Sequence, residues 1–185
     1  LRTPDIIVLT LVEQKRLMAA LEVNPSIYAI GILIALTTGI RVGEVCALKW
    51  SNIDMQKKVI KIRQTLQRLP NLNPECKQKT IIVISSPKSD NSIRDIFFND
   101  ILLEKIIAHK KFATKKLGIQ CTSDEQYVIT RCFNKPVEPR TMQDAFKRYL
   151  RLADVNEVNF HTLRHTFATR ALESGVDYKT LSLIL

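Results

Sequence analysis

One run of apolar residues, Ile27 to Thr38, constrains the fold of this chain most. The preceding Asn24-Pro25 pair places proline in the first turn of a helix, and Gly39 follows the run as a helix stop. Apolar side chains recur around nearly the whole circumference of that helix, so protein must cover it on all sides. About a dozen residues are too few for the roughly 20 that span a bilayer. The pattern therefore predicts the central helix of a folded core, and no membrane segment.

Helical periodicity continues on both sides of this central helix. Thr10-Leu-Val-Glu13 forms a capping box, which predicts a helix from there to about Glu22. The lead-in 1–9 contains Pro4 and has the character of a linker, so we expect one domain over residues 10–185. The remaining predicted helices cover residues 42–48, 99–117, 139–152, 160–170 and 177–185.

Three segments change to an alternation of period two: residues 59–62, 81–84 and 93–98. Val, Ile and Phe dominate these segments, which predicts strands that we expect to pair in one antiparallel sheet. Three further segments are predicted as a long exposed loop, a short strand and a second loop: 68–79, 127–130 and 132–139. The predicted fold class is α+β, mainly α, with a helical core and a small three-stranded antiparallel sheet at one edge.

The charge balance favours a nucleic-acid partner. The 185 residues include 28 Lys and Arg against 18 Asp and Glu, a formal charge of +10, and 45% hydrophobic content is that of an ordinary globular protein. The four cysteines, Cys46, Cys76, Cys121 and Cys132, are far apart and form no CxxC pair. They are typical of reduced thiols, so we expect a cytoplasmic protein.

The stretch from Phe160 to Arg170 concentrates the residues capable of chemistry. His161, Arg164 and His165 occupy positions i, i+3 and i+4, so one helical face carries all three, while an apolar stripe faces the core. A guanidinium matches phosphate oxygens with a rigid fork of donors, and imidazole can move a proton near neutral pH. We therefore predict a phosphate site on this face.

Two other interpretations of this face remain open. One is a surface helix without a functional site, whose charges are solvated. The other is a zinc site, because His161 and His165 have the i, i+4 spacing of a metal-binding helix. However, Thr162 stands where the glutamate of such a motif would be, and the sequence offers no obvious third ligand.

Arg41 and Lys88 are candidates for the same site. Arg41 stands at a predicted helix start, which suits an anion, and Glu44 can either pair with it or orient it. Lys88 lies in a compact turn at 87–91, from which it could reach a separate site or serve only solubility. His109 falls among lysines and is predicted on a solvated basic face, without chemistry.

These motifs together resemble, in order and spacing, the catalytic domain of tyrosine recombinases, the phage integrase family. The segments that carry the resemblance cover essentially the whole chain: Thr37-Thr-Gly-Ile-Arg-Val-Gly-Glu44, Leu48-Lys-Trp50, Lys88 before Ile93-Arg94, His161-Thr-Leu-Arg-His165 and Phe167-Ala-Thr169.

The resemblance implies a role for each matching residue. Arg41 and Arg164 correspond to the two phosphate-clamping arginines, Lys88 to the hairpin lysine that acts as general acid, and His161 to the histidine of the HxxR motif. Glu44 corresponds to the acidic residue that supports the first arginine. His165 matches a common family residue that does not belong to the catalytic set. The family uses neither cofactor nor metal.

The reaction implied is site-specific DNA recombination. A tyrosine attacks a phosphodiester of duplex DNA, forms a 3′-phosphotyrosyl link and releases a 5′-hydroxyl, so no ATP is needed. Family members work as tetramers on DNA in the bacterial cytoplasm, whereas we expect this chain alone to be monomeric.

Two departures from the family pattern lead to further expectations. None of the four tyrosines stands where the family has its nucleophile, which we expect beyond Leu185, so the chain itself should be inactive. A preceding DNA-clamping domain is also expected before Leu1. The alternatives are a DNA-binding module without catalysis, a type IB topoisomerase or telomere resolvase, and a zinc hydrolase built on His161 and His165.

Overall fold

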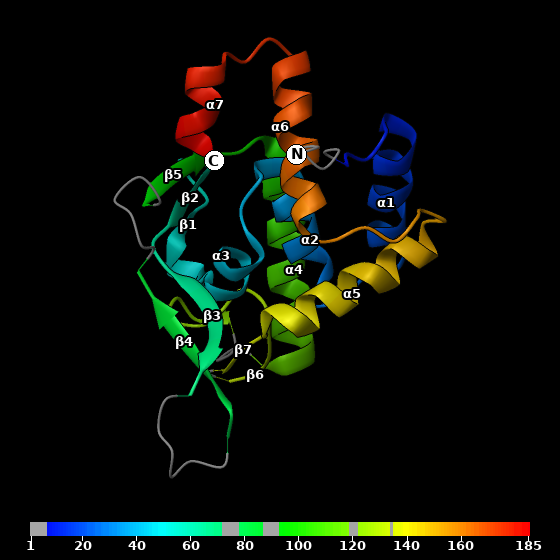
Figure 1. Cartoon of the computed structure of the whole chain (residues 1–185). Coiled ribbons are helices and arrows are strands. Elements are labelled where there is room, and N and C mark those ends of the chain that lie inside the picture. The colour runs from blue at the N-terminus through cyan, green and yellow to red at the C-terminus, as the bar shows by residue number, and fades with distance from the viewer. Residues whose placement is uncertain (1–6, 72–77, 87–92, 119–121, 134) are drawn as a thin grey trace.

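The computed structural model describes residues 7–71, 78–86, 93–118, 122–133 and 135–185. Its helices and strands follow one another along the chain as drawn in Figure 1. The helices are α1 (Leu11–Val23), α2 (Ala29–Thr38), α3 (Val42–Ala47), the short 3-10 turn η1 (Trp50–Asn52), α4 (Asp100–Leu117), α5 (Pro139–Leu152), α6 (His161–Glu173) and α7 (Tyr178–Ile184). The strands are β1 (Ile53–Asp54), β2 (Val59–Ile62), β3 (Thr65–Pro70), β4 (Thr80–Ser85), β5 (Arg94–Phe97), β6 (Thr130–Cys132) and β7 (Lys135–Pro136).

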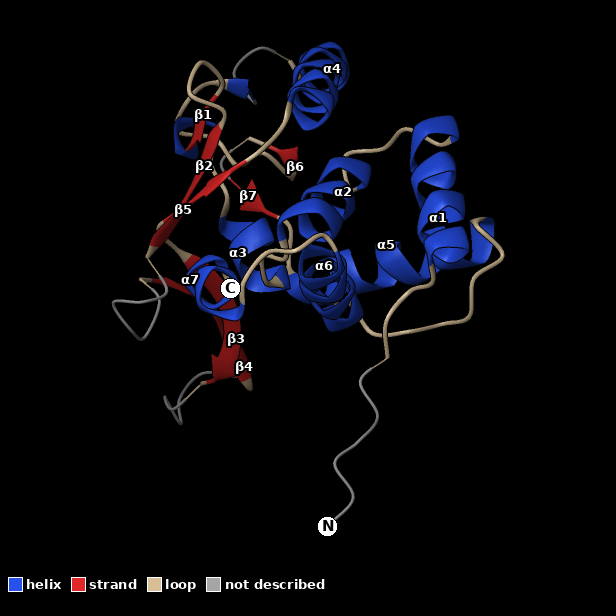
Figure 2. Ribbon diagram, turned by 90° about the horizontal axis from the view of Figure 1, so that it is seen from above, coloured by secondary structure: helices blue, strands red, loops and turns tan. Residues whose placement is uncertain are grey.

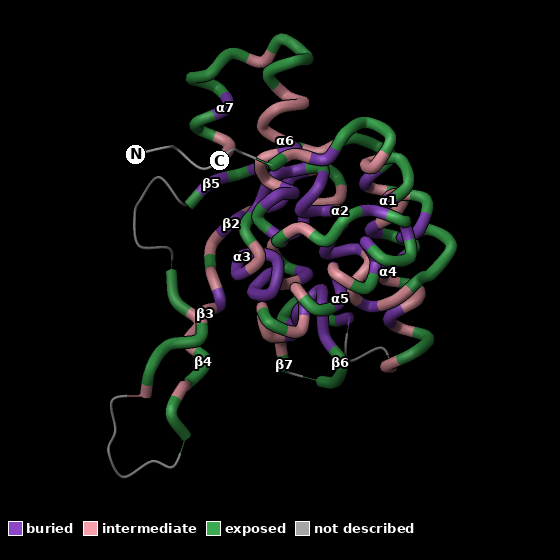
Figure 3. The backbone as a smooth tube through the Cα atoms, turned by 45° about the vertical axis from the view of Figure 1, so that its right-hand side comes forward, coloured by how far each residue is buried: buried purple, intermediate pink, exposed green. Residues whose placement is uncertain are grey.

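The central helix predicted from the apolar run is confirmed as α2. It contacts α1, α3, α4 and α6, and Figure 2 shows it among these helices. Ile32, Ile34 and Ala35 have no exposed surface, and each fully buried isoleucine contributes about 1.5–3 kcal/mol. In Figure 3 the buried stretches gather in α2 and α3, while α7 and the β3–β4 hairpin are largely exposed.

The helix begins at Ala29, later than the Asn24-Pro25 start that the sequence predicted. The buried Tyr149 of α5 explains the delay. Its hydroxyl donates to the Asn24 carbonyl and lies 2.8 Å from Ser26 Oγ, which in turn accepts from the Tyr28 amide. The Asn24 carbonyl and the Tyr28 amide are therefore hydrogen-bonded to side chains, and the chain from Asn24 to Tyr28 does not need helical hydrogen bonds.

The sheet differs from the predicted one. A three-stranded antiparallel sheet exists, but its order is β1–β2–β5, with Ile60 opposite both Ile53 and Ile96. The predicted member 81–84 is instead β4, which pairs with β3 in a separate hairpin that projects from the helices in Figure 1. Ile81 and Ile82 are about 40% exposed, so their apolar character did not indicate a place in the core.

Three smaller segments also differ from the predictions. The predicted exposed loop 68–79 begins inside β3, and the short strand predicted at 127–130 is β6, which starts only at Thr130. The predicted loop 132–139 contains β7 and the start of α5. In α5, core spacing in the sequence also pointed to Leu152, but Leu152 is exposed and Leu150 is buried, because helical spacing from Phe146 selects Leu150 for the core.

His109 is buried, which corrects its predicted place on a solvated face. It lies on the stripe of α4 that also carries Leu102, Ile106 and Ala113, and only 7% of its surface is exposed. Nε2 donates to the Val128 carbonyl at 2.9 Å. Burial lowers the pKa of His109, an effect that this hydrogen bond only partly opposes. The role of His109 is structural. Its spacing from Leu102 and Ile106, i, i+4 and i+7, was the sequence signal for burial.

The remaining helices follow their predicted boundaries closely. Thr10 caps α1 with the complete capping box to Glu13, and α4 and α7 begin after Asn99 and Asp177, whose side chains accept from backbone amides of the first turn. Leu9 is buried, and its amide donates to Thr166 Oγ1 of α6 at 3.0 Å. No helix of the described residues has the length and apolar character that crossing a membrane requires.

Gly39 gives the first testable consequence of this packing. It ends α2 with φ of 70°, and a Cβ there would lie 2.6 Å from both Phe167 Cδ1 and Leu185 Cδ2. We expect Gly39→Ala to lower the free energy of unfolding by about 1–2 kcal/mol from the backbone strain alone, with the clash adding to it. Urea denaturation measures the loss.

Gly175 provides the matched control for this prediction. Its φ is 88°, but a Cβ there meets nothing within 4 Å, so Gly175→Ala carries the strain without the clash. The loss should therefore be smaller than at Gly39. Equal losses at both positions would contradict the packing around Gly39.

Candidate active site

Arg41, His161 and Arg164 line one hollow. Arg41 immediately precedes α3, and the other two residues come from the first turn of α6. The hollow holds about 400 Å³, and its remaining lining comes from Ile40, Val42, Gln143, Asn159 and Phe160. Lys88, the fourth candidate, lies outside the described residues. The structure thus brings three of the four candidates together on one concave face.

Arg41 is fixed on one side and open on the other. Its backbone is extended and its amide donates to Glu44 Oε2 at 2.9 Å, which completes the N-terminal cap of α3. Its Nη1 also donates to Glu44 Oε1 at 3.2 Å. The side chain remains 48% exposed, and a guanidinium has five N–H donors. The two sequence interpretations are therefore compatible, because the salt bridge orients Arg41 and leaves N–H donors that an anion can bind.

Glu44 is buried beneath this arginine and is held by a second one, Arg94. Arg94 Nη1 and Nη2 donate to Oε1 and Oε2 of Glu44 at 3.0 and 2.9 Å, so each carboxylate oxygen accepts one bond from each arginine. Burial raises the pKa of Glu44, but the hydrogen bonds and charges of Arg94 and Arg41 outweigh it and hold the pKa below its usual value. Glu44 is thus an ionised linker between two arginines.

Arg94 was not predicted to have a role of its own. The signal was the alternation of β5, in which Arg94 and Ile96 point inward while Asp95 and Phe97 point outward. An arginine on the inward face of a strand requires a buried acceptor. Glu44 is that acceptor, 50 residues away along the chain.

Arg164 is held by two backbone carbonyls. Its Nη1 donates to the carbonyl of Gly39 after α2 at 2.9 Å, and its Nη2 donates to the carbonyl of Leu185. Gly39 lies at the C-terminus of α2, where the partial negative charge of a helix favours a cation. Burial, together with the charges of Arg41 and Arg94, lowers the pKa of Arg164 to about 10, so it remains charged at neutral pH.

His161 lies at the mouth of the same hollow. Partial burial lowers its pKa, and the positive charges of His165, Arg164 and Arg41 lower it further, so the neutral imidazole predominates at pH 7. The rings of His161 and His165 meet edge to face at 4.5 Å. Among the described residues no group of three or more His, Cys, Asp and Glu is placed to hold a metal ion. The zinc alternative therefore has no third ligand in that part of the chain.

Two lining residues, Gln143 and Asn159, were missed. Asn159 Oδ1 accepts from the Thr162 amide at 3.1 Å and so satisfies the first turn of α6. The Asn-x-x-Thr spacing was a signal for this cap. Gln143 reaches the hollow from α5, and no sequence signal separates it from a solvated residue.

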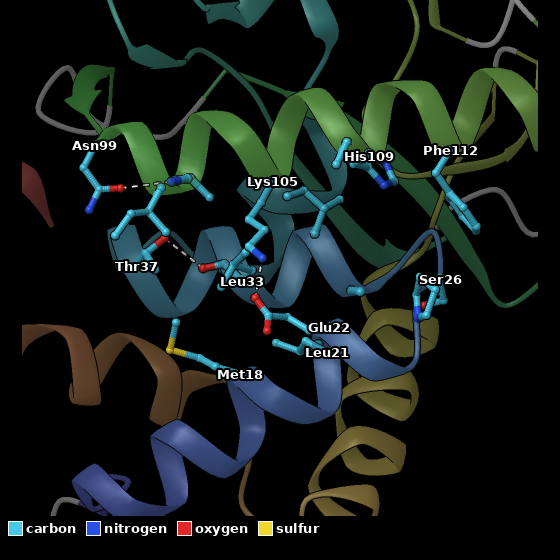
Figure 4. Close-up of a pocket in the computed structure, with 16 residues that line it drawn as sticks. Met18, Leu21, Glu22, Ser26, Leu33, Thr37, Asn99, Lys105, His109 and Phe112 are labelled. Atoms are coloured by element: carbon cyan, nitrogen blue, oxygen red, sulfur yellow. Dashed lines mark hydrogen bonds and ion pairs between the residues drawn. The ribbon is translucent and has the colours of Figure 1, made fainter.

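A second hollow of about 380 Å³ lies between α1, α2 and α4 and is shown in Figure 4. Its walls are mainly apolar, with Met18, Leu33 and Phe112 among them, and an ion pair joins Lys105 to Glu22 across it. None of the candidate residues lines it. The groups suited to binding a phosphate therefore lie in the first hollow.

Comparison with known proteins is consistent with this geometry. The model of the phage integrase family matches residues 8–185. A tyrosine recombinase XerC-like protein of Caldanaerobacter subterraneus is 30% identical over 83% of this chain and 40% of its own length.

Two solved structures share the fold. An integrase of the transposon Tn1549, in complex with transposon right end DNA, superposes with a TM-score of 0.76 at 20% identity, over 98% of this chain and 58% of its own. A lambda integrase tetramer bound to a Holliday junction gives a TM-score of 0.57 at 19% identity, over 100% of this chain and 48% of its own.

This chain spans about 40% of the length of the curated relatives it matches. Within that span the family model covers nearly every residue, including Arg41, His161 and Arg164. The chain therefore belongs to the phage integrase family, that of the tyrosine recombinases.

Proposed function

We propose that this chain is the main part of the catalytic domain of a site-specific DNA recombinase, which binds duplex DNA and activates one phosphodiester for attack by a tyrosine. The observation that carries the proposal is the convergence of Arg41, Arg164 and His161 on one hollow, with Arg41 oriented by the buried Glu44. Two charged guanidinium groups can bind the non-bridging oxygens of a phosphate.

The proposed mechanism follows from these groups. The tyrosine oxygen forms a bond to phosphorus while the bond from phosphorus to the 5′ oxygen breaks. Arg41 and Arg164 stabilise the charge that develops on the phosphorane, as the donors of an oxyanion hole do. Lys88, assigned by the family resemblance, donates a proton to the leaving 5′ oxygen. The neutral imidazole of His161 can accept the proton that the tyrosine loses.

The tyrosines of the chain are poor candidates for the nucleophile. Tyr127 and Tyr149 are buried, and the Tyr149 hydroxyl is engaged by Asn24 and Ser26. Tyr178 is exposed, but it begins α7, whereas Leu185 after the end of α7 contacts Arg164. Seven residues of helix separate those two points by about 10 Å.

Tyr28 precedes α2 and is only partly exposed. It packs against the hydrophobic core cluster and does not line the hollow. We propose that the nucleophile is a tyrosine outside these 185 residues, carried by a segment that follows α7.

Duplex DNA is the proposed partner. Lys147, Arg148 and Arg151 follow the lining residue Gln143 along α5 and add positive charge to that helix, with Lys147 paired to Glu157. By analogy with the lambda integrase tetramer on a Holliday junction, we propose that the longer protein acts as a tetramer in the bacterial cytoplasm, with this chain alone a monomer.

A DNA-binding module without catalysis is the second candidate function, supported by the buried or distant placement of Tyr127, Tyr149 and Tyr178.

Covalent trapping on a nicked suicide duplex tests the proposal. The longer protein should yield a DNA adduct that survives denaturing electrophoresis. Cleavage releases the short fragment that carries the free 5′-hydroxyl, and without this hydroxyl the strand cannot be religated. The 185-residue chain should bind the same DNA and give no adduct. Binding by both proteins without any adduct would favour the non-catalytic module. An adduct with the chain alone that Tyr178→Phe abolishes would overturn the assignment of the nucleophile.

A further inference from the structure

Arg94 does not line the hollow, yet its guanidinium is connected to two elements beside it. Only 7% of Arg94 is exposed. Its Nη1 and Nη2 donate to both oxygens of Glu44, and its Nε donates to the carbonyl of Ile184 at 2.6 Å. One planar group thus joins strand β5 both to α3 and to the last turn of α7.

The connection to α3 reaches Arg41. The carboxylate oxygens of Glu44 that accept from Arg94 also accept from the Arg41 amide and from Arg41 Nη1. A carboxylate offers about four acceptor positions, and these bonds occupy them. Movement of the Glu44 side chain would therefore change the orientation of Arg41 directly.

The connection to α7 reaches the end of the chain described here. Ile184 is the last residue of α7, and Leu185 after it contributes the carbonyl that Arg164 binds. Strand β5 and α7 are also in contact. Arg94 therefore lies between the anchor of Arg41 and the point from which a following segment would continue.

A lysine could neutralise Glu44 equally well, but it could not make these three bonds. Its ammonium is a single centre, whereas the planar fork of arginine presents Nε, Nη1 and Nη2 at fixed angles to different acceptors. The geometry thus uses the shape of the guanidinium as well as its charge. This distinguishes a positioning role from simple charge neutralisation.

We propose that Arg94 is a positioning residue of the recombinase reaction, which holds Arg41 through Glu44 and the end of α7 through the Ile184 carbonyl. The phosphate-binding guanidinium and the segment after α7 then keep a constant relative position. This inference rests on the proposed function, because it concerns the delivery of a tyrosine to the phosphate bound by Arg41.

The first test compares Arg94→Gln and Arg94→Lys in the longer protein. A misplacement of about 1 Å can cost about 100-fold in rate, so we expect single-turnover cleavage of the suicide duplex to slow by about that factor in both variants, with little change in DNA affinity. Arg16→Gln is the control. Arg16 lies on α1, and its exposed ion pair with Asp154 involves none of Arg94, Glu44 and α7.

The second test asks whether Arg94 acts partly through Arg41. If it does, the combined loss in Arg94→Gln with Arg41→Lys should be smaller than the product of the two single losses, and the part that remains comes from the tether to α7. Fully multiplicative losses would show that Arg94 acts independently of Arg41 and would overturn the proposal.

Hydrogen exchange of the backbone amides tests the two tethers without any reaction. Arg94→Gln should accelerate exchange in the peptides that cover residues 40–47 and 178–185, while Arg16→Gln should not. Unchanged exchange in either peptide would overturn the tether, as would uniform acceleration throughout the chain. If the wild-type protein forms no adduct, the proposed function fails and with it the catalytic role of Arg94, whereas the exchange data still decide whether the tethers exist.

Discussion

Replacing Arg164 by alanine in the longer protein will slow covalent DNA cleavage by about 100-fold or more. Arg164 carries a full charge at neutral pH and is held in the hollow by the carbonyls of Gly39 and Leu185. The bond that we propose between Arg164 and the phosphate becomes strongest as charge develops in the transition state, so the loss should appear in the cleavage rate. Single-turnover adduct formation at saturating protein measures that rate.

DNA binding should suffer much less in the same variant. In a plot of the logarithm of the binding constant against the logarithm of the salt concentration, each phosphate contact contributes about −0.9 to the slope. Arg164→Ala should therefore make the slope shallower by no more than about 0.9, the contribution of one contact. Arg164→Lys is the conservative comparison, since it keeps a charge but loses the second donor that reaches Leu185. Arg16→Ala, which removes an exposed arginine on α1, should leave both cleavage and binding unchanged.

Replacing Glu44 by alanine will destabilise the fold by about 3–5 kcal/mol. The substitution leaves the charge of Arg94 buried and without the carboxylate that compensates it, and it removes the cap of α3 at Arg41. Urea denaturation gives the free energy of unfolding. Glu173→Ala is the matched control, because Glu173 pairs with Arg170 at the same i, i+3 spacing but on the surface, where about 0–1 kcal/mol is expected.

A second substitution identifies the cause of that loss. Arg94→Met in the Glu44→Ala background removes the uncompensated charge and should restore part of the stability. If the double variant is as unstable as the sum of the two single losses, the buried charge does not account for the effect.

The contribution of Glu44 should also disappear in acid. Its pKa in the folded protein lies below the value of about 4.5 expected in the unfolded chain, so the unfolded state binds the proton more readily. The stabilisation is therefore fully present above about pH 4.5 and is lost as pH falls through the folded pKa. The difference between wild type and Glu44→Ala should be constant near neutral pH and shrink in acid. A difference that grows on acidification would contradict the linkage.

The sequence predicted the features that depend on local periodicity. An apolar run bounded by Pro25 and Gly39 has only one favourable environment, the interior, and α2 occupies it. A capping box needs only residues three apart, and the one at Thr10 is present. The face shared by His161 and Arg164 likewise follows from spacing within one helix, since side chains at i and i+3 are neighbours.

Long-range pairing was beyond the reach of the same reasoning. Residues 81–84 form a continuous apolar run like that of a central strand, yet β4 belongs to a projecting hairpin, because which strand pairs with which depends on the path of the whole chain. The prediction for His109 was wrong because the neighbouring lysines indicate a solvated face, whereas helical spacing from Leu102 and Ile106 places His109 on the buried stripe of α4.

The sequence by itself determined which residues of this protein are suited to bind a phosphate, because guanidinium and imidazole carry their chemistry wherever they stand. Only the tertiary structure decided that Arg41 and Arg164, 123 positions apart in the sequence, line one hollow. It also decided that Arg94 lies beneath them, bonded to Glu44 and Ile184. The physical reason is desolvation: a buried charge must find a partner of opposite charge or polarity, and folding, not sequence spacing, selects that partner.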